Sequence, residues 1–182
     1  MDLGITGRTA LVTASSKGLG RASAEALAAE GVKVVICARH GEELFAARDE
    51  IARKTGADID AKTADVTDPS DIKGLVDFTV QRFGGLDILV SNAGGPPPGS
   101  FEGFSDDDWL EAWNLNGMST VRLIREALPH MRKARWGRII AVTSIAVKEP
   151  VDSLVLSNSV RASIHGLVKT LSRQAAGDGI TC

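Results

Sequence analysis

The chain contains no tyrosine, so no phenolic side chain is available as an acid, a base or a hydrogen-bond partner. It has only two cysteines, Cys37 and Cys182, which are too few for a disulfide framework. Cys37 stands in an apolar run, so we expect a buried, unreactive thiol rather than a redox centre. No apolar run approaches the length of a membrane span, which argues against a membrane protein.

A strong charge of either sign is also absent. Lys and Arg number 21 against 23 Asp and Glu, for a net charge of −2. This balance argues against nucleic acid or an anionic membrane as a partner. The N-terminus has no apolar segment typical of a signal peptide, so we expect a cytoplasmic location. With 182 residues, 43% hydrophobic and 24% charged, the composition suits a single domain over 1–182.

Strand and helix patterns alternate along the chain. Strands are predicted at 8–14, 32–38, 59–66, 86–94 and 138–144, with a sixth beginning at 179. Helices are predicted at 19–31, 41–56, 68–84, from 105 to about 135, and 154–177. The fourth of these is a long helical region that is expected to start at a capping box made by Ser105 and Asp108.

Several of these strands are near-continuous apolar runs, which is typical of strands covered on both faces. Helical crossovers of the usual hand place helices on both faces of a parallel sheet. The sequence therefore predicts an α/β fold with a doubly wound, Rossmann-type parallel sheet. The chain ends as the sixth strand begins, and we expect the fifth strand to be exposed at the sheet edge.

A hydroxyl-and-glycine cluster, "TASSKGLG", follows the first strand. In a doubly wound sheet, ligands bind beyond the carboxyl ends of the strands, where this cluster lies. Gly18 and Gly20 would let a ligand approach the backbone, and the free N–H groups that open the next helix suit a pyrophosphate. The alternative is a tight strand-to-helix turn with no ligand.

The cluster resembles the TGxxxGxG cofactor loop of the short-chain dehydrogenase/reductase family. The matching residues are Thr13, Ala14, Ser15, Ser16, Lys17, Gly18, Leu19 and Gly20. Ala14 replaces the family's first glycine; its methyl group is a small intrusion if its φ is negative, so we expect cofactor binding to survive. Other motifs stand in the same order: Asp65-Val66 resembles the adenine-binding pair, and Asn92-Ala93-Gly94 matches the NAG motif.

The resemblance extends from about residue 5 to the end and is strongest to the β-ketoacyl-carrier-protein-reductase-like branch. It implies that Thr143 and Ser144 end the fifth strand beside the cofactor, and that Asn116 is the family's helical asparagine, with Asn114 as the alternative. It also implies a homodimer or homotetramer packed through helices around 105–135 and 154–176.

The end of the second strand indicates which nicotinamide is bound. An acid there would bind the 2′-hydroxyl of NAD, but Ala38 occupies that place and Arg39 follows. Lys17 lies in the glycine loop nearby, so two cations with no carboxylate favour NADP, with NAD still possible. The alternative is that both cations are solvated surface charges.

The family uses a tyrosine as acid/base, a lysine four residues later, and an upstream serine. Ser144 matches the serine, but Ser157 and Arg161 stand where the tyrosine and lysine are expected. An aliphatic hydroxyl is far less acidic than a phenol, and an arginine stays protonated. The resemblance thus implies a degenerate catalytic set of Ser144, Asn116, Ser157 and Arg161, with no metal.

Three functions remain open from the sequence. The chain is an oxidoreductase that transfers a hydride between a nicotinamide cofactor and a carbonyl or alcohol substrate. Alternatively, it is a nucleotide-binding module that has lost this chemistry, or a scaffold whose helices pair with another chain. Family members usually continue past residue 182 with a substrate-covering segment, so we expect that part to be lacking here.

Overall fold

The structure is a computed structural model that describes residues 2–182. It contains a six-stranded parallel sheet in the order β3-β2-β1-β4-β5-β6. The strands are β1 (Thr9–Val12), β2 (Lys33–Ala38), β3 (Ile59–Thr63), β4 (Ile88–Ser91), β5 (Gly137–Ala141) and β6 (Ile180–Thr181). The predicted doubly wound, Rossmann-type fold is confirmed, and the strand order reverses between β1 and β4, where such sheets open a ligand crevice.

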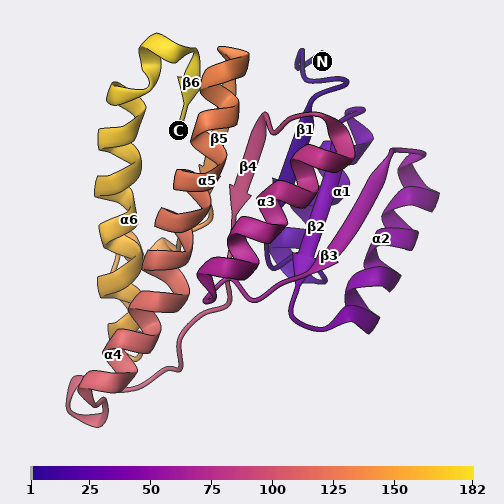
Figure 1. Cartoon of the computed structure of the whole chain (residues 1–182). Helices are drawn as coiled ribbons and strands as arrows, with labels where there is room; N and C mark the ends of the chain where they lie inside the picture. The colour runs from indigo at the N-terminus through magenta and orange to yellow at the C-terminus, as the bar shows by residue number, and fades with distance from the viewer. Residues whose placement is uncertain (1) are drawn as a thin grey trace.

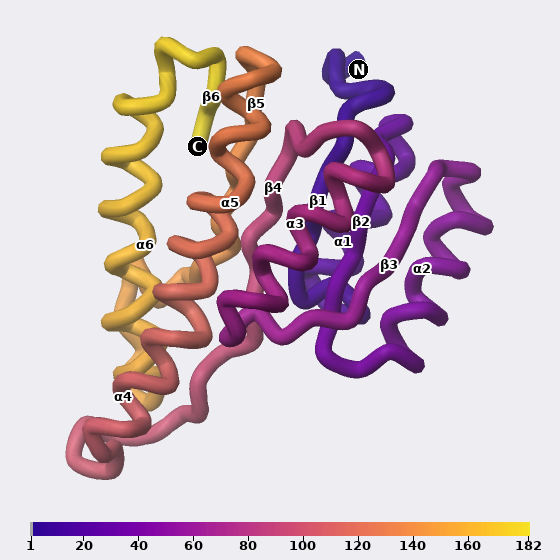
Figure 2. Tube along the Cα trace, viewed as in Figure 1, coloured from indigo at the N-terminus to yellow at the C-terminus, as the bar shows by residue number. Residues whose placement is uncertain are grey.

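Helices cover both faces of this sheet (Figures 1 and 2). One face carries α1 (Gly18–Ala29) and α2 (Gly41–Thr55), which pack on β1, β2 and β3. The other face carries α3 (Pro69–Phe83) and α5 (Ser119–Ala134), joined by the carboxyl end of α6 (Val155–Gln174). The short helix α4 (Asp106–Ala112) lies beside the start of α6 at the carboxyl end of the sheet.

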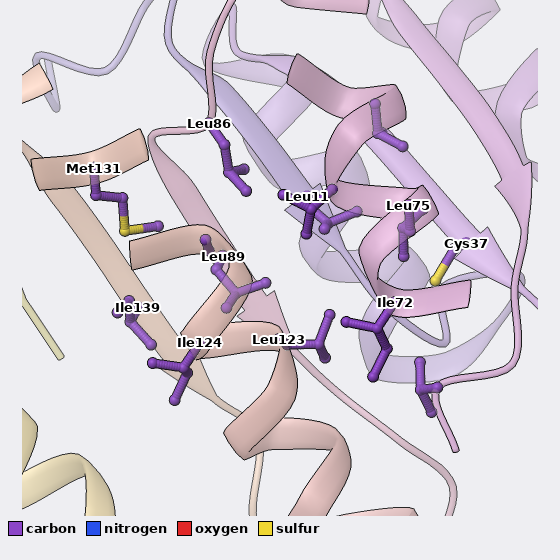
Figure 3. Close-up of a cluster of buried hydrophobic side chains, with 14 of the residues drawn as sticks. Leu11, Cys37, Ile72, Leu75, Leu86, Leu89, Leu123, Ile124, Met131 and Ile139 are labelled. Atoms are coloured by element: carbon purple, nitrogen blue, oxygen red, sulfur yellow. The ribbon is translucent and has the colours of Figure 1, made fainter. Parts of the chain in front are cut away.

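Apolar side chains from the sheet, α3 and α5 form the larger core (Figure 3). Leu11 and Leu89 of the central strands meet Ile72, Leu75 and Leu123 of the covering helices, and all five are fully buried. Each such side chain contributes about 1.5–3 kcal/mol through burial. The core holds the central strands in register, and this register places their carboxyl ends side by side.

The helix boundaries follow the local signals in the sequence. Gly56 and Gly84 end α2 and α3 in the left-handed conformation, at φ +69° and +85°. The Asp68 carboxylate caps α3 by accepting from the amides of Ser70 and Asp71. The predicted capping box of Ser105 and Asp108 is present at the start of α4. These caps fix where each helix leaves the strand ends.

The predicted helical region from 105 to about 135 is helical, but it is not a single regular α-helix. A π-helical segment, Trp113–Met118, separates α4 from α5. Such segments insert an extra residue and redirect the side chains around it, often at functional sites. Here the segment faces the carboxyl end of β4, as described below.

The sixth strand pairs with the first half of β5, so the prediction of an exposed β5 is only partly correct. Gly137 and Arg138 are registered with Ile180 and Thr181. Beyond this pairing, the Ile140 side chain is 50% exposed. Within residues 2–182, no helix is long and apolar enough to span a membrane.

Candidate functional site

The loop between β1 and α1 is fastened to the end of β4 by a threonine. The Thr13 hydroxyl donates to the Asn92 carbonyl oxygen at 2.7 Å and accepts from the Asn92 amide at 2.9 Å. The Asn92 side-chain nitrogen in turn donates to the Ala14 carbonyl at 3.2 Å. These bonds join the two strand tips on either side of the point where the strand order reverses.

Gly20 lies directly under this loop. A Cβ added at Gly20 would overlap the Ala14 carbonyl oxygen and lie 2.9 Å from the Asn92 side-chain nitrogen. Only glycine fits, because the loop backbone rests on the first turn of α1. Lys17 begins that helix without a side-chain cap, so the opening amides are free to bind an anion.

Ala14 adopts a left-handed backbone conformation with φ +47°. The condition of a negative φ, under which the methyl group would be a small intrusion, is therefore not met. The reason lies at the next residue: the Ser15 amide and hydroxyl bond the Cys37 and Val12 carbonyls, which pulls the chain sharply into the sheet. Non-glycine residues in this conformation are strained by about 1–2 kcal/mol.

Replacing Ala14 with glycine is expected to raise the free energy of unfolding by about 0.5–1 kcal/mol. Relief of the left-handed strain exceeds the extra flexibility that glycine gives the unfolded chain. Urea unfolding measures the change. Ala22→Gly, on the exposed face of α1, is the control and should lose up to about 1 kcal/mol. A destabilised Ala14→Gly variant would contradict the assigned strain.

Ser15 and Cys37 lie beneath the loop rather than at its surface. Both are fully buried, and the Cys37 amide donates to the Ser15 hydroxyl at 3.1 Å. Burial raises the pKa of the Cys37 thiol to about 12, so the thiol stays protonated at neutral pH. The structure therefore places Ser15 in a supporting role below the site and confirms Cys37 as a buried, unreactive thiol.

A cavity of about 540 Å³ opens above the strand tips. It gathers many of the predicted binding residues, which come from four separate loops: Ser16, Lys17, Leu19, Arg39, Asp65, Val66, Asn92, Ala93 and Gly94. Ala14 of the glycine loop and Ala38 at the end of β2 also line it. The wall further contains residues that the motifs did not indicate: His40, Glu43, Ala64, Gly95 and Leu115. Thr13, Ser15, Gly18, Gly20 and Thr143 support or adjoin this wall without lining it.

Both cations at one corner of the cavity have acidic neighbours. The Lys17 ammonium lies 3.6 Å from the Glu43 carboxylate. The amide and hydroxyl of Thr67, assisted by the charge of Arg39, hold the pKa of Asp65 below its usual range. The prediction that no carboxylate accompanies these two cations is wrong, because the first turn of α2 brings Glu43 to the corner.

The π-helical segment distinguishes the two candidate asparagines. Asn116 is buried, and its side-chain nitrogen donates to the Gly94 carbonyl at 2.7 Å. Its side-chain oxygen is buried without a hydrogen-bond partner among residues 2–182. Asn114 instead donates to the Thr67 carbonyl and accepts from Arg122, away from the ends of β4 and β5. Asn116 is therefore the asparagine that adjoins the strand tips.

Arg161 joins the tips of two strands. One terminal nitrogen of its guanidinium donates to the Val142 and Thr143 carbonyls, each at 3.0 Å. The other donates to the Ala93 and Gly94 carbonyls at 3.3 and 3.2 Å. The side chain is buried without an acidic partner among the described residues, and burial lowers the pKa of its guanidinium. The four terminal N–H groups of the guanidinium thus donate to backbone carbonyls of the protein.

The two candidate catalytic serines lie on either side of this arginine. Ser144 follows Thr143, and its hydroxyl accepts from the Ala146 amide at 3.1 Å. Ser157 is buried one helical turn before Arg161 on α6, and its hydroxyl makes no hydrogen bond to another described residue. Arg161 therefore fixes the end of β5, just before Ser144, to the helix that carries Ser157.

Comparison with known proteins finds relatives along almost the whole chain. The model of a family described as short chain dehydrogenase matches residues 8–182. The 3-oxoacyl-(acyl-carrier-protein) reductase of Escherichia coli is 34% identical over 175 residues, covering 96% of this chain and 70% of that protein. The chain spans 64% of the length of a polyketide synthase putative ketoacyl reductase from Streptomyces violaceoruber, to which it is 37% identical over 174 residues.

Two solved structures are similar along almost the whole chain. L-sorbose reductase from Gluconobacter frateurii, complexed with NADPH and L-sorbose, has a TM-score of 0.95 and 35% identity, over 99% of this chain and 68% of that one. A short chain oxidoreductase from Pseudomonas aeruginosa PAO1, NADPH-bound and described as containing an atypical catalytic center, has a TM-score of 0.91 and 30% identity. That match covers 95% of this chain and 68% of the other.

Proposed function

Since this chain belongs to the short chain dehydrogenase family, we propose that it is an NADP-dependent oxidoreductase acting on a small-molecule carbonyl or alcohol. Residues 1–182 would form its single dinucleotide-binding domain. The observation that carries the proposal is the cavity above the strand tips, where the glycine loop, Arg39, Asp65 and the Asn92–Gly94 segment converge. Ketoacyl-reductase-like relatives and NADPH-bound neighbours support the same assignment.

The residues present fit a dinucleotide. Gly20 has no room for a side chain, so the Ala14 loop packs directly on the first turn of α1, and the uncapped start of α1 offers amides for a diphosphate. Lys17 and Arg39 would face the ribose phosphate, and Asp65 with Val66 would hold the adenine. Asn92, Ala93 and Gly94 would lie under the nicotinamide half, close to Thr143.

Ser157 and Arg161 would replace the tyrosine and lysine on which the family's usual chemistry depends. The bound cofactor supplies or accepts the hydride at the substrate carbon. In reduction, the Ser144 and Ser157 hydroxyls would donate hydrogen bonds to the substrate oxygen, and water would deliver its proton. The Arg161 guanidinium has no acidic partner among the described residues, so its positive charge would stabilise the alkoxide that develops on the substrate oxygen. The guanidinium itself would stay protonated.

A nucleotide-binding module without turnover is the second candidate function. It is favoured by the absence of a phenol in the chain and by the four backbone carbonyls that occupy the Arg161 guanidinium. Acid catalysis contributes about 10²–10⁴-fold in enzymes. A weakened acid would therefore slow the chemical step by about this factor and leave cofactor binding intact.

Single-turnover measurements distinguish these two functions. NADPH bound to the full chain is mixed with a panel of ketones, aldehydes and 3-oxoacyl thioesters, and loss of the reduced nicotinamide absorbance is followed. The oxidoreductase predicts enzyme-dependent oxidation with at least one carbonyl, slowed by Ser144→Ala. Tight NADPH binding with no oxidation across the panel would instead identify the module.

We also propose a cytoplasmic homodimer or homotetramer. Leu110 and Trp113, which are 64% and 40% exposed, lie one helical turn apart on α4 and the π-helical segment. Burying these apolar side chains against a second copy would be favourable. Light scattering on the purified chain tests the assembly, and a monomer at micromolar concentration would refute it.

A further inference from the structure

We propose that Glu43 limits the preference of this site for NADPH over NADH. This inference rests on the proposed function, since it concerns the same cavity. Glu43 lies in the first turn of α2, and the cavity wall that contains it also contains Lys17, Arg39 and Asp65. The sequence motifs did not assign any role to Glu43, because it follows the end of β2 by five residues.

The corner of the cavity formed by these four side chains is electrically balanced. Lys17 and Arg39 carry two positive charges, and Glu43 and Asp65 carry two negative charges. Asp65 is held in place by hydrogen bonds from the amide and hydroxyl of Thr67, at 2.9 and 2.7 Å. Glu43 has no such hydrogen bond among residues 2–182, and its contact with Lys17 is a single 3.6 Å ion pair.

A 2′-phosphate would change this balance, whereas a 2′-hydroxyl would not. To bind the phosphate, Lys17 must turn away from Glu43, and the phosphate then lies near the Glu43 carboxylate. NADH brings no charge to this corner, so it neither competes for Lys17 nor meets repulsion. Glu43 therefore weakens NADPH binding and leaves NADH binding unchanged.

The size of this effect is limited by solvent. The side chains of Lys17 and Glu43 are 81% and 58% exposed, so water and salt screen their charges. We expect Glu43→Gln to tighten NADPH binding by about three- to fivefold at low ionic strength and less at high salt. The dissociation constant for NADH should stay within about twofold of the wild-type value.

Calorimetric titration of the full chain with NADPH and with NADH provides the test. The matched control is Glu42→Gln, which removes the same charge from the same helical turn but lies outside the cavity wall. Glu42→Gln should change neither dissociation constant. Because both variants remove one charge from the start of α2, this control separates a local effect of Glu43 from a general effect on the helix dipole. In the Lys17→Met variant, adding Glu43→Gln should tighten NADPH binding less, because there is no Lys17 ammonium that the loss of the Glu43 charge could free for the phosphate.

Three outcomes would overturn the inference. Glu43→Gln could leave NADPH affinity unchanged, tighten NADPH and NADH alike, or act no more strongly than Glu42→Gln. In each case the wild-type chain still binds NADPH, and the proposed function stands. If the folded wild-type chain binds neither nucleotide, the proposed function itself fails, and the role of Glu43 fails with it.

Discussion

Replacing Gly20 with alanine is expected to weaken NADPH binding about a hundredfold. The added Cβ would overlap the Ala14 carbonyl oxygen and press on the Asn92 side-chain nitrogen, and the Ala14 backbone cannot rotate away as a side chain can. The glycine loop must lift from α1, which separates the loop amides from the helix amides that together face the diphosphate. Overpacking costs up to about 3 kcal/mol, and this corresponds to the stated loss of affinity.

Calorimetry with NADPH measures this loss, and urea unfolding shows whether the variant remains folded. Gly18→Ala is the matched control in the same loop. Gly18 has φ +60° but open space around its Cβ position, so alanine there brings strain of about 1 kcal/mol without a clash. Its effect on affinity should stay below about tenfold. Wild-type affinity in Gly20→Ala would show that the loop does not hold the nucleotide.

Replacing Arg161 with methionine is expected to lower the free energy of unfolding by at least about 3 kcal/mol. Methionine fills similar space, but it leaves the carbonyls of Ala93, Gly94, Val142 and Thr143 without their donors. A buried carbonyl that loses its partner costs about 1–3 kcal/mol. The four bonds of Arg161 are partly buried, so water restores some of them but not all. The ends of β4 and β5 would then separate at the place where the nicotinamide is expected.

Urea unfolding measures this loss, with two companion variants. Arg161→Lys keeps the charge and up to three donors, so it should lose about half as much stability and remain folded for measurement. Arg173→Met, near the exposed carboxyl end of α6, should change stability by no more than about 0.5 kcal/mol. An Arg161→Met variant as stable as Arg173→Met would contradict the role of Arg161 at the strand tips.

The sequence was sufficient for the fold because its signals are local. Apolar runs marked the strands, Gly56 and Gly84 marked helix ends, and Ser105 with Asp108 marked the start of α4. The parallel direction of the strands then followed from the alternation of strands and helices along the chain. Together these features predict that the motif loops share one end of the sheet, as the cavity lining shows.

The remaining features of the site depend on contacts between residues far apart in the chain. The φ of Ala14 is set by the bonds of Ser15 to β2, and the targets of Arg161 lie 18 to 68 residues away. Local sequence cannot specify such distant hydrogen-bond partners, although the charge and the burial of Arg161 can be anticipated from it. The place of Glu43 in the site could have been inferred from the sequence, although less directly. An acid in the first turn after β2 can reach the same corner of the cavity as Arg39.

The most direct test of this account is calorimetric titration of the folded full chain with NADPH, paired with thermal unfolding. The account predicts saturable heat with one site per chain and a melting temperature that rises with nucleotide concentration, because the ligand binds only the native state. It also predicts that both signals nearly vanish in Gly20→Ala. No heat and no rise in melting temperature for well-folded wild-type protein would contradict nucleotide binding across the strand tips.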